Sequence, residues 1–386
     1  MNVIQQDSVS VLVRPIGACN HNCSYCFDKD WHNDFRIISK ETIEDLMNKL
    51  CKEYINIFWT WHGGEFTLVG KEWFSEMNWL IQKIAHYNGV ELTICAQTNG
   101  SLLDDEWRKI FDTYNVNYGL SYDGEYGQIA QRGFPIPENV LNKSYSTITV
   151  ITKKNIDYLI DIYEEGKKRY FNQLSYNFVF DTNKDKNLLG DLDYALEKYK
   201  EFVFYYLYDK NPEGVKERTT HQWISLALGK GADVCLFTDC VNQKNFFCIT
   251  NTGDLWKCDT TYIKEFYLGN LSEFDNISDI FKTPAYMDII ELKRLQGKNC
   301  VKCENYQICS NGCIGNVLCD GKENIGPDKL HCLFMRKLLP DIYKEICDLS
   351  AEDLYKLNPC VKRELISKSY LPLSLKKKAW EEVYEK

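Results

Sequence analysis

Apolar and polar positions along the first half of the chain follow two alternating patterns. Short apolar runs of strand length recur at residues 9–13, 55–61, 90–96, 116–122, 144–151 and 174–180. Between these runs, apolar side chains return every three or four positions, which is typical of helices that bury one face. We expect such helices after Ser39, which can cap the first turn, and at residues 71–86, 104–111 and 155–170.

Alternating strands and helices predict a parallel sheet, because each parallel strand needs a crossover connection to reach the next. Six such units close most of a barrel. The sequence therefore predicts an α/β fold with a partial (β/α)6 barrel of the TIM type. In that architecture the loops at the carboxyl ends of the strands carry the chemistry.

Beyond the predicted barrel the pattern changes. A charged stretch leads into a linking helix expected at residues 191–209, and glycines at positions 229 and 231 mark a boundary. Alternating positions on both sides of an Asn-Thr-Gly-Asp turn then predict a β-hairpin over residues 246–258. A further helix is expected at residues 333–349. We expect a barrel domain at 1–228, a second domain at 229–345 and a helical tail at 346–386.

The composition of the 386 residues argues against several partners. The net charge is −9 and no long basic run interrupts the first 360 residues, so we expect no nucleic acid partner. Neither a signal peptide nor a run of 18 apolar residues is visible, so we expect no membrane association and a cytoplasmic location. Seventeen cysteines in spaced clusters fit metal–sulfur ligation in a reducing compartment better than disulfides.

Three cysteines follow the first predicted strand. Cys19, Cys23 and Cys26 have the spacing Cys-x3-Cys-x2-Cys, and three thiolates so close together suit one soft metal centre. Structural zinc sites and iron–sulfur clusters prefer four protein ligands, so three thiolates leave one iron of a cluster open to a small molecule. The alternatives are a zinc site completed by His21 or His32, and three unconnected thiols.

A second set of cysteines lies beyond the predicted boundary. It comprises Cys235, Cys240, Cys248, Cys258, Cys300, Cys303, Cys309, Cys313, Cys319 and Cys332. The spacing Cys300-x2-Cys303 is common for two ligands of one metal. Two sites with four ligands each use eight of the ten cysteines, whereas a zinc ribbon uses four.

The first cysteine loop, with Tyr25 before its last cysteine, resembles the radical SAM superfamily. The resemblance implies that Cys19, Cys23 and Cys26 hold a 4Fe–4S cluster whose fourth iron binds S-adenosylmethionine (SAM). It also implies that the backbone of Tyr25 faces the adenine. Gly63, Gly64 and Glu65 follow the second strand and resemble the family's GGE motif, which binds the amino group of SAM. Glycines at this position also let the backbone come close to a ligand.

Other contacts with SAM follow from the same resemblance. The third strand is followed by Thr98 and Asn99, and the fourth contains Ser121 near its end; both segments resemble those of sulfatase-maturating enzymes, where the serine contacts SAM. Arg132, in a loop with glycine, is a candidate partner for the SAM carboxylate, because a guanidinium can bind a carboxylate through two hydrogen bonds.

The second set of cysteines resembles the SPASM extension of radical SAM enzymes. The matching segments are Cys240-x12-Gly253-x4-Cys258 and Cys300-x2-Cys303-x5-Cys309-x3-Cys313. The resemblance implies two auxiliary 4Fe–4S clusters, and three clusters in all. The implied ligands are Cys235, Cys240, Cys258 and Cys313 for the first auxiliary cluster, and Cys300, Cys303, Cys309 and Cys332 for the second.

The cysteines left over are interpreted as structural. Cys248 is expected in the core, although it stays an alternative to Cys235 as a ligand. Cys319 is left spare. Cys51, Cys95, Cys347 and Cys360 fall in helix or strand patterns, where a cysteine behaves as a small apolar residue.

Asp259, directly after Cys258, is by the same resemblance the candidate catalytic base, and Tyr262 is a second candidate. A carboxylate beside a cluster can accept the proton released when a carbon radical is oxidised. The resemblance implies that a 5′-deoxyadenosyl radical abstracts hydrogen from the substrate and that the auxiliary clusters take part in the following oxidation. It also implies a reductant such as flavodoxin or ferredoxin.

The branch of the superfamily that the chain resembles modifies residues within peptides or proteins, so we expect a peptide or protein substrate. The sequence departs from sulfatase-maturating enzymes at His62, where they carry Gln, and at Phe66, where they carry Pro. Because we expect both positions on the SAM and substrate side of the barrel, we favour cross-linking or a similar modification of a ribosomally made peptide. The alternative is conversion of Cys or Ser to formylglycine in a sulfatase. An iron–sulfur electron carrier and a double zinc-ribbon binding module are the non-enzymatic alternatives.

Overall fold

The computed structural model describes residues 6–141, 146–179, 187–210, 215–229, 235, 239, 241–259, 263–319, 325–349 and 356–366. The chain divides into two compact units, and each is described by itself. The first unit comprises Met1–Ser121, Arg132–Val140 and Asp239–Leu295, and the second comprises Tyr122–Gln131, Leu141–Thr238 and Gln296–Lys386. This division rests on compactness alone and leaves the predicted domain bounds as predictions.

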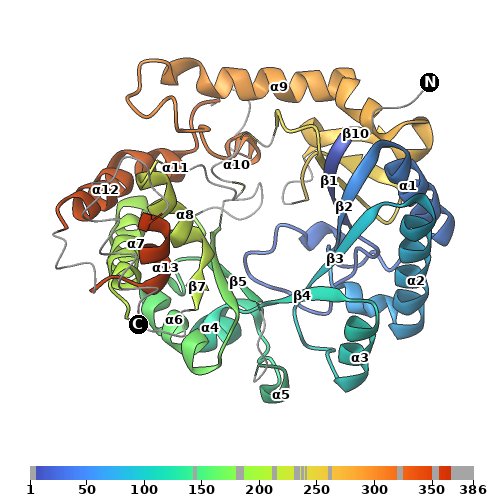
Figure 1. Cartoon of the computed structure of the whole chain (residues 1–386), viewed down its shortest axis with the longest axis horizontal. Helices are drawn as coiled ribbons and strands as arrows, with labels where there is room; N and C mark the ends of the chain where they lie inside the picture. Colours follow the sequence, from blue (N-terminus) through green and yellow to red (C-terminus); the bar gives the residue numbers. More distant parts are fainter. Residues whose placement is uncertain are drawn as a thin grey trace. The chain divides into compact units, whose positions relative to one another are not determined.

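A parallel sheet forms the centre of the first unit (Figure 1). Its strands are β1 (Gln6–Val13), β2 (Tyr54–Trp61), β3 (Glu91–Thr98) and β4 (Val116–Ser121), and each pairs in parallel with the next. The helices α1 (Lys40–Glu53), α2 (Lys71–Asn88) and α3 (Asp105–Thr113) lie along one side of this sheet. The α/β class and the strands and helices predicted for this region are therefore confirmed, with small shifts of their ends.

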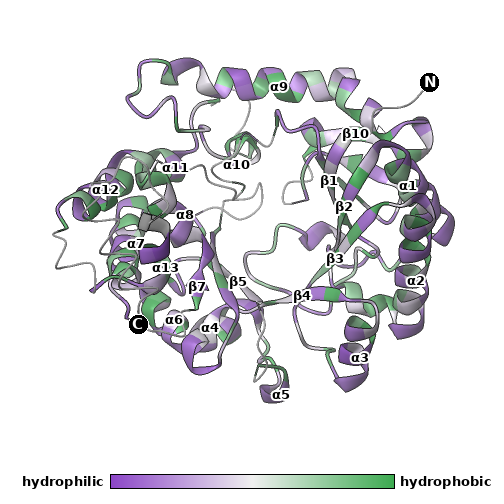
Figure 2. Ribbon diagram, viewed as in Figure 1, coloured by the Kyte–Doolittle hydropathy of each residue, from purple (hydrophilic) through white to green (hydrophobic). Residues whose placement is uncertain are grey.

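The start of α1 follows from its sequence. The side-chain oxygen of Ser39 accepts a hydrogen bond from the backbone N–H of Thr42 at 3.0 Å, which satisfies one donor of the first turn. The buried face consists of the apolar residues that the spacing predicted, together with Cys51 and Glu53. Hydrophobic and hydrophilic residues alternate in bands along α1 and α2 (Figure 2), as expected for helices that cover a sheet with one face.

An aromatic cluster joins β2 to α2 and α3. Its rings belong to Trp61, Phe66, Phe74, Trp107 and Phe111, with ring centroids of contacting pairs 5.1 to 6.3 Å apart. Phe66 is completely buried in this cluster, because it begins a short 3-10 helix, Phe66–Val69, that turns the ring toward the outer helices. The expectation that Phe66 lies on the SAM and substrate side is therefore wrong.

The predicted hairpin is present, but it does not stand apart from the sheet. β8 (Phe246–Ile249) and β9 (Asp254–Trp256) are antiparallel, and β10 (Tyr267–Asn270) follows beside β9. β8 also pairs in parallel with β1, with Ser10 opposite Phe246 and Val13 opposite Ile249. The strand order in the first unit is therefore β10-β9-β8-β1-β2-β3-β4.

The second unit has a smaller parallel sheet of β5 (Ser146–Ile151), β6 (Gln173–Phe178) and β7 (Lys216–Glu217). The predicted helices correspond to α6 (Leu159–Lys168), α7 (Leu192–Leu207) and α12 (Leu339–Cys347), the last preceded by a π-helical turn at Phe334–Leu338. The helix α8 (Arg218–Ala227) was not predicted. All its residues after the first are buried, among them the polar Thr219, Thr220, His221 and Gln222, so its burial cannot be read from the spacing of apolar residues.

The remaining helices are α4 (Gly124–Gly127), α5 (Glu138–Leu141), α9 (Pro284–Gly297), α10 (Ile314–Leu318), α11 (Lys329–Leu333) and α13 (Pro359–Ile366). Within the ranges that the structure describes, no helix is both long enough and apolar enough to cross a membrane.

Candidate active site

The loop between β1 and α1 carries the first three cysteines. Backbone hydrogen bonds close it: the N–H of Ala18 donates to the carbonyl of Asp34 at 2.8 Å, and the N–H of Cys26 donates to that of Cys23 at 3.1 Å. The loop is also tied to the turn after β2, because the N–H of Glu65 donates to the carbonyl of Ala18 at 2.9 Å. The carboxyl ends of β1 and β2 thus present the cysteines and the Gly-Gly-Glu segment together.

The thiols of this loop lie in a setting that suits iron–sulfur ligation. The backbone N–H of His21 donates to Sγ of Cys19, and that of Asp28 donates to Sγ of Cys26, each at 3.4 Å. Hydrogen bonds to sulfur are one of the means by which proteins stabilise and tune such clusters. Burial raises the pKa of Cys19 to about 11 and that of Cys26 to about 12, and neighbouring negative groups, Cys23 among them, act in the same direction. The three thiols therefore lie within electrostatic reach of one another.

Only one contact, between His32 and Cys26, fits the alternative of a zinc site. His32 Nε2 lies 3.4 Å from Sγ of Cys26, and burial lowers the pKa of His32. Among the described residues, however, no three or more His, Cys, Asp or Glu side chains surround the position of a single metal ion. A four-iron cluster distributes its ligands over separate iron atoms, so its thiols stand farther apart than those around one ion.

The two glycines after β2 pack against the chain itself. A Cβ on Gly63 would lie 2.0 Å from Cγ of Arg14, and a Cβ on Gly64 would lie 2.1 Å from the carbonyl oxygen of Ala18. Their φ angles are +79° and +31°, which an L side chain rarely adopts. These positions therefore need glycine for the close approach of two loops, whatever else their backbone binds.

Glu65 is the centre of a buried hydrogen-bond network. Its Oε1 accepts from the N–H and hydroxyl of Thr67 at 3.2 and 2.6 Å and from the hydroxyl of Thr98 at 2.8 Å, while Oε2 accepts from the N–H of Asn99 at 2.7 Å. Burial raises the pKa of Glu65 against these hydrogen bonds, which lower it. The amide of Asn99 reaches the cysteine loop, with Nδ2 2.8 Å from Oδ1 of Asn20. The structure thus brings together Glu65, Thr98 and Asn99, three residues predicted separately.

Two other predicted SAM contacts meet at the cysteine loop. The guanidinium of Arg132 lies over the ring of Tyr25, 5.5 Å from its centroid, and both residues are buried. Arg132 does not lie in a loop as expected, because it is the last residue of a π-helical turn, Gln128–Arg132. Ser121 ends β4, and its hydroxyl accepts a hydrogen bond from Nε2 of Gln97 at 2.9 Å.

A buried ion pair beside the cysteines was not predicted. Arg14 NH1 donates to Oδ1 of Asp28 at 2.7 Å, and both side chains are almost fully buried. The guanidinium also lies over the ring of Trp31, 5.2 Å from the centroid. The available signal was an arginine directly after an apolar strand, three residues before the glycine that opens the loop.

Asp259, the predicted base, contacts His62. Oδ2 of Asp259 lies 3.3 Å from Nδ1 of His62, and Sγ of Cys258 lies 3.9 Å from Oδ1 of the same carboxylate. Asp259 follows β9 and His62 follows β2, so the hairpin brings the predicted base to the end of a barrel strand. Tyr262, the second candidate, lies outside the described residues.

The four cysteines predicted for the second auxiliary cluster gather in the second unit. Cys300, Cys303, Cys309 and Cys332 line one pocket. Burial raises the pKa of Cys309, and the other three thiols add to this effect. The backbone N–H of Asn311 donates to Sγ of Cys309 at 3.4 Å, as in the first cysteine loop.

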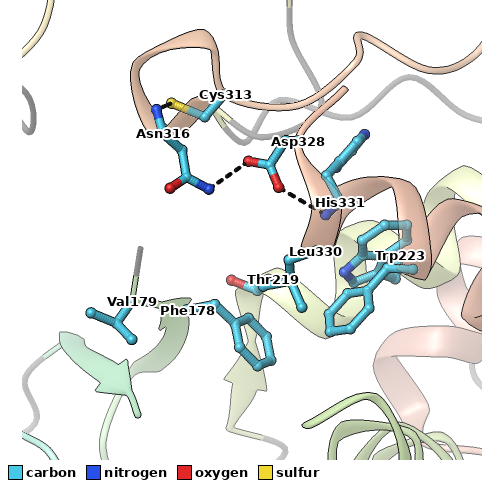
Figure 3. A pocket seen from close by; sticks show the side chains of 10 residues that line it. Phe178, Val179, Thr219, Trp223, Cys313, Asn316, Asp328, Leu330 and His331 are labelled. Atoms are coloured by element: carbon cyan, nitrogen blue, oxygen red, sulfur yellow. Dashed lines mark hydrogen bonds between the residues drawn. The ribbon is translucent and has the colours of Figure 1, made fainter. Parts of the chain in front are cut away.

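The predicted ligands of the first auxiliary cluster are described only in part. Cys240 lies outside the described residues. Cys258 belongs to the first unit, and Cys235 and Cys313 belong to the second. Cys313 lines a pocket with Phe178, Trp223 and other side chains, and its sulfur accepts from the N–H of Asn316 at 3.4 Å (Figure 3).

Of the five cysteines interpreted as structural, two are buried, Cys95 and Cys360 are partly buried, and one is exposed. Cys248 on β8 and Cys51 on α1 are buried, which confirms them as core residues. Cys347 is exposed, so its interpretation as a buried residue is wrong. It is the last residue of α12, where the buried face is formed by Leu339, Ile342 and Ile346.

Comparison with known proteins identifies the class. Residues 13–124, from the end of β1 to the start of α4, match the model of the radical SAM superfamily. The protein therefore carries a radical SAM domain and is an enzyme.

Particular relatives extend the similarity over most of the chain. The cysteine-type anaerobic sulfatase-maturating enzyme of Clostridium novyi is 25% identical over 335 residues, which is 80% of this chain and 88% of that protein. The mycofactocin maturase MftC of Mycolicibacterium smegmatis is 24% identical over 333 residues, 81% of this chain and 79% of that protein.

A solved structure of anSMEcpe with bound AdoMet has a TM-score of 0.75 at 22% identity and covers 89% of this chain and 98% of that one. The same enzyme with bound AdoMet and Cp18Cys peptide gives a TM-score of 0.73 at 22% identity, covering 87% and 99%. This likeness establishes the radical SAM fold predicted from the sequence.

Proposed function

We propose that this enzyme binds SAM and a 4Fe–4S cluster at the carboxyl ends of β1 to β4 and modifies a residue within a peptide. One observation carries the proposal: the cysteine loop is hydrogen-bonded to the Gly-Gly-Glu turn through Glu65 N–H and Ala18 O at 2.9 Å. Cys19, Cys23 and Cys26 hold the cluster, and their sulfurs have N–H donors that fit this role.

The bound cluster and SAM supply the one-electron chemistry that removes a hydrogen atom from a carbon of the substrate. The residues of the chain bind SAM and orient it. Tyr25 and Arg132, stacked beside the loop, contact SAM, together with Ser121 at the end of β4. Oε2 of Glu65 accepts one hydrogen bond from the chain, so it keeps room to accept another from the SAM ammonium.

The cysteines beyond the barrel form a SPASM domain at 229–345 with two auxiliary 4Fe–4S clusters. Cys300, Cys303, Cys309 and Cys332 hold one of them, supported by the pocket that they line. Cys235, Cys240, Cys258 and Cys313 hold the other. Asp259 accepts the substrate proton at a carboxylate oxygen, in line with its place beside Cys258. A flavodoxin or ferredoxin supplies electrons in the cytoplasm.

A peptide substrate is supported by the relatives, since one is a mycofactocin maturase and anSMEcpe binds a peptide in its solved structure. For the particular reaction we favour modification of a ribosomally made peptide. The departure at His62 supports this choice, because His62 contacts the proposed base. The change at Phe66 gives no support, since Phe66 is buried in the aromatic cluster. Conversion of Cys or Ser to formylglycine stays the second candidate, in keeping with the sulfatase-maturating relatives.

The cofactor content can be measured on anaerobically purified protein. We expect roughly twelve irons per chain, the sum of three four-iron clusters, and 5′-deoxyadenosine formation from SAM with a reductant. Changing Cys19, Cys23 and Cys26 to Ala removes about four irons and abolishes 5′-deoxyadenosine. Changing Cys300, Cys303, Cys309 and Cys332 removes about four irons as well. The exposed Cys347→Ala is the matched control and keeps all iron. Two zincs without sulfide contradict the proposal.

Mass spectrometry of peptide products distinguishes the two candidate reactions. Synthetic sulfatase-type peptides with one Cys or Ser test for the thiol or hydroxyl to aldehyde conversion. Short peptides encoded beside the gene test for loss of two hydrogens with a new cross-link. The favoured reaction predicts the second product, and aldehyde in the first set of peptides selects formylglycine formation instead.

A further inference from the structure

His62 and Asp259 come from distant parts of the sequence and meet in the first unit. Nδ1 of His62 lies 3.3 Å from Oδ2 of Asp259. We propose that His62 is the positioning residue of Asp259: its Nδ1–H holds the carboxylate, and Nε2 stays an acceptor toward the substrate. This inference rests on the proposed function, in which Asp259 takes up the substrate proton.

The chemistry of the two side chains assigns the proton. A neutral imidazole has one donor and one acceptor nitrogen, and an ionised carboxylate only accepts. The contact therefore places the proton on Nδ1 and leaves the lone pair on Nε2, as in other carboxylate–histidine pairs. A glutamine amide in place of the imidazole presents an oxygen or an NH2 group depending on how it turns. Histidine held by Asp259 presents an acceptor only.

Burial distinguishes the two partners. The side chain of Asp259 is 11% exposed and that of His62 is 29% exposed, so the carboxylate is the inner member. The backbone fixes His62, because its N–H donates to the carbonyl of Val13 at 2.9 Å and continues the sheet at the end of β2. The next residue, Gly63, packs on Arg14. The imidazole therefore projects from an anchored backbone.

Arg14 and Asp28, two charged residues near the His62–Asp259 pair, are bonded to each other. Asp28 lies near Asp259: burial raises the pKa of Asp28 most, Arg14 lowers it, and the charge of Asp259 raises it to a smaller extent. Arg14 is bonded to Asp28 at 2.7 Å. The buried Arg14–Asp28 pair thus borders the His62–Asp259 pair, and its two members bind each other.

Two variants separate the two halves of the pair. His62→Asn keeps an amide donor near the position of Nδ1 and removes the group at Nε2. His62→Gln places its amide near Nε2 and removes the donor at Nδ1. His62→Leu removes both. His86→Asn, on an exposed position of α2, is the matched control and behaves as wild type.

Kinetics on a peptide that the wild-type enzyme modifies provide the first test. We expect His62→Asn to keep kcat within about threefold and to raise the peptide KM about tenfold, as for one lost hydrogen bond. His62→Gln lowers kcat at least about tenfold with little change in KM, because Asp259 loses its orientation. His62→Leu shows both effects. Equal losses in all three variants indicate a structural role and overturn the inference.

NMR on the full chain as anaerobically purified provides the second test, which needs no turnover. With 15N-labelled histidine, the signal that disappears in His62→Asn should show the Nδ1–H tautomer. In Asp259→Asn it should shift toward the Nε2–H tautomer. An Nε2–H tautomer in the wild type overturns the inference even if the enzyme modifies peptides. An Nδ1–H tautomer that depends on Asp259, in a protein that modifies no peptide, keeps the pair and rejects the proposed function.

Discussion

Arg14 donates a hydrogen bond to the carboxylate of Asp28 at 2.7 Å, and both side chains are almost fully buried. Arg14 directly follows β1, and Asp28 lies two residues beyond Cys26, so the pair joins the two ends of the cysteine loop. The backbone of Asp28 at the same time donates to Sγ of Cys26. The shape of the loop therefore depends on an ion pair as well as on its three thiols.

Removing one member of this pair should be costly. Asp28→Asn leaves the guanidinium of Arg14 buried without its counter-charge, which is expected to lower the free energy of unfolding by about 3–5 kcal/mol. Thermal unfolding of anaerobically purified protein measures the effect, and iron analysis shows whether the loop still loads its cluster. Asp30→Asn, two residues away and exposed, should change stability by less than about 0.5 kcal/mol. Equal stability of the two variants contradicts a structural role for the pair.

Gly64 should tolerate no side chain. In Gly64→Ala the new Cβ lies 2.1 Å from the carbonyl oxygen of Ala18, so the turn after β2 and the cysteine loop have to separate. We expect loss of iron from the first cluster and a lower Tm. Gly89→Ala is a suitable control: its φ of +65° carries the same type of backbone strain, but nothing lies within 4 Å of the new Cβ. Its cost should stay at about 1–2 kcal/mol, with iron content unchanged.

Replacing Glu65 should disturb the network that joins the cysteine loop to β3. In Glu65→Gln, an NH2 group meets a hydrogen-bond donor, either Asn99 N–H at Oε2 or the donors at Oε1, at an expected cost of about 1–3 kcal/mol. The exposed Glu72→Gln is the control.

The effect should also depend on pH. The pKa of Glu65 is raised in the folded protein, so its contribution to stability is lost as pH rises through the folded pKa and is regained as pH falls. The difference in stability between wild type and Glu65→Gln should therefore widen toward acid pH. Urea unfolding at several pH values measures this difference in free energy of unfolding. If the difference between wild type and Glu65→Gln narrows on acidification, the raised pKa of Glu65 is contradicted.

The partly buried thiols of the cysteine loop should react slowly in the iron-free protein. The pKa of Cys19 is raised to about 11, so at pH 8 its thiolate fraction, which reacts with iodoacetamide, is about a hundredfold below that of an ordinary thiol. The alkylation rate of Cys19 should then rise about tenfold per pH unit toward pH 11. Mass spectrometry of the alkylated peptides gives the rates, with the exposed Cys347 as internal reference. Complete alkylation of Cys19 at pH 8 on the time scale of Cys347 argues against this burial.

The sequence predicted those features that are written in local patterns. Apolar runs predicted the strands β1 to β4, helical spacing predicted the helices α1 to α3, and Ser39 marks the start of α1. α8 escaped prediction because it is buried on all sides, and β7 because it has only two residues. The place of Phe66 was misjudged, since the direction of its ring is set by packing against α2 and α3.

The candidate site shows the same limit. Glu65, Thr98 and Asn99 were each singled out by a motif, but their mutual hydrogen bonds join the ends of two strands and appear only in three dimensions. The Arg14–Asp28 pair and the contact of His62 with Asp259 depend on loop geometry in the same way. Motifs therefore identify single residues, whereas contacts between residues of different loops become visible only in the structure.

The pairing of β8 with β1 has a consequence for how the protein is made. β1 is synthesised well before the strand on one of its sides, Phe246–Ile249, which follows more than 230 residues later in the sequence. Until then β1 presents an open edge with unpaired backbone groups, which invites association with other chains. Because loop closure over such a distance slows folding, correct assembly of the N-terminal cysteine loop should depend on the region that carries the later cysteines. Truncation before residue 246 is thus expected to yield an aggregating chain instead of a smaller radical SAM enzyme.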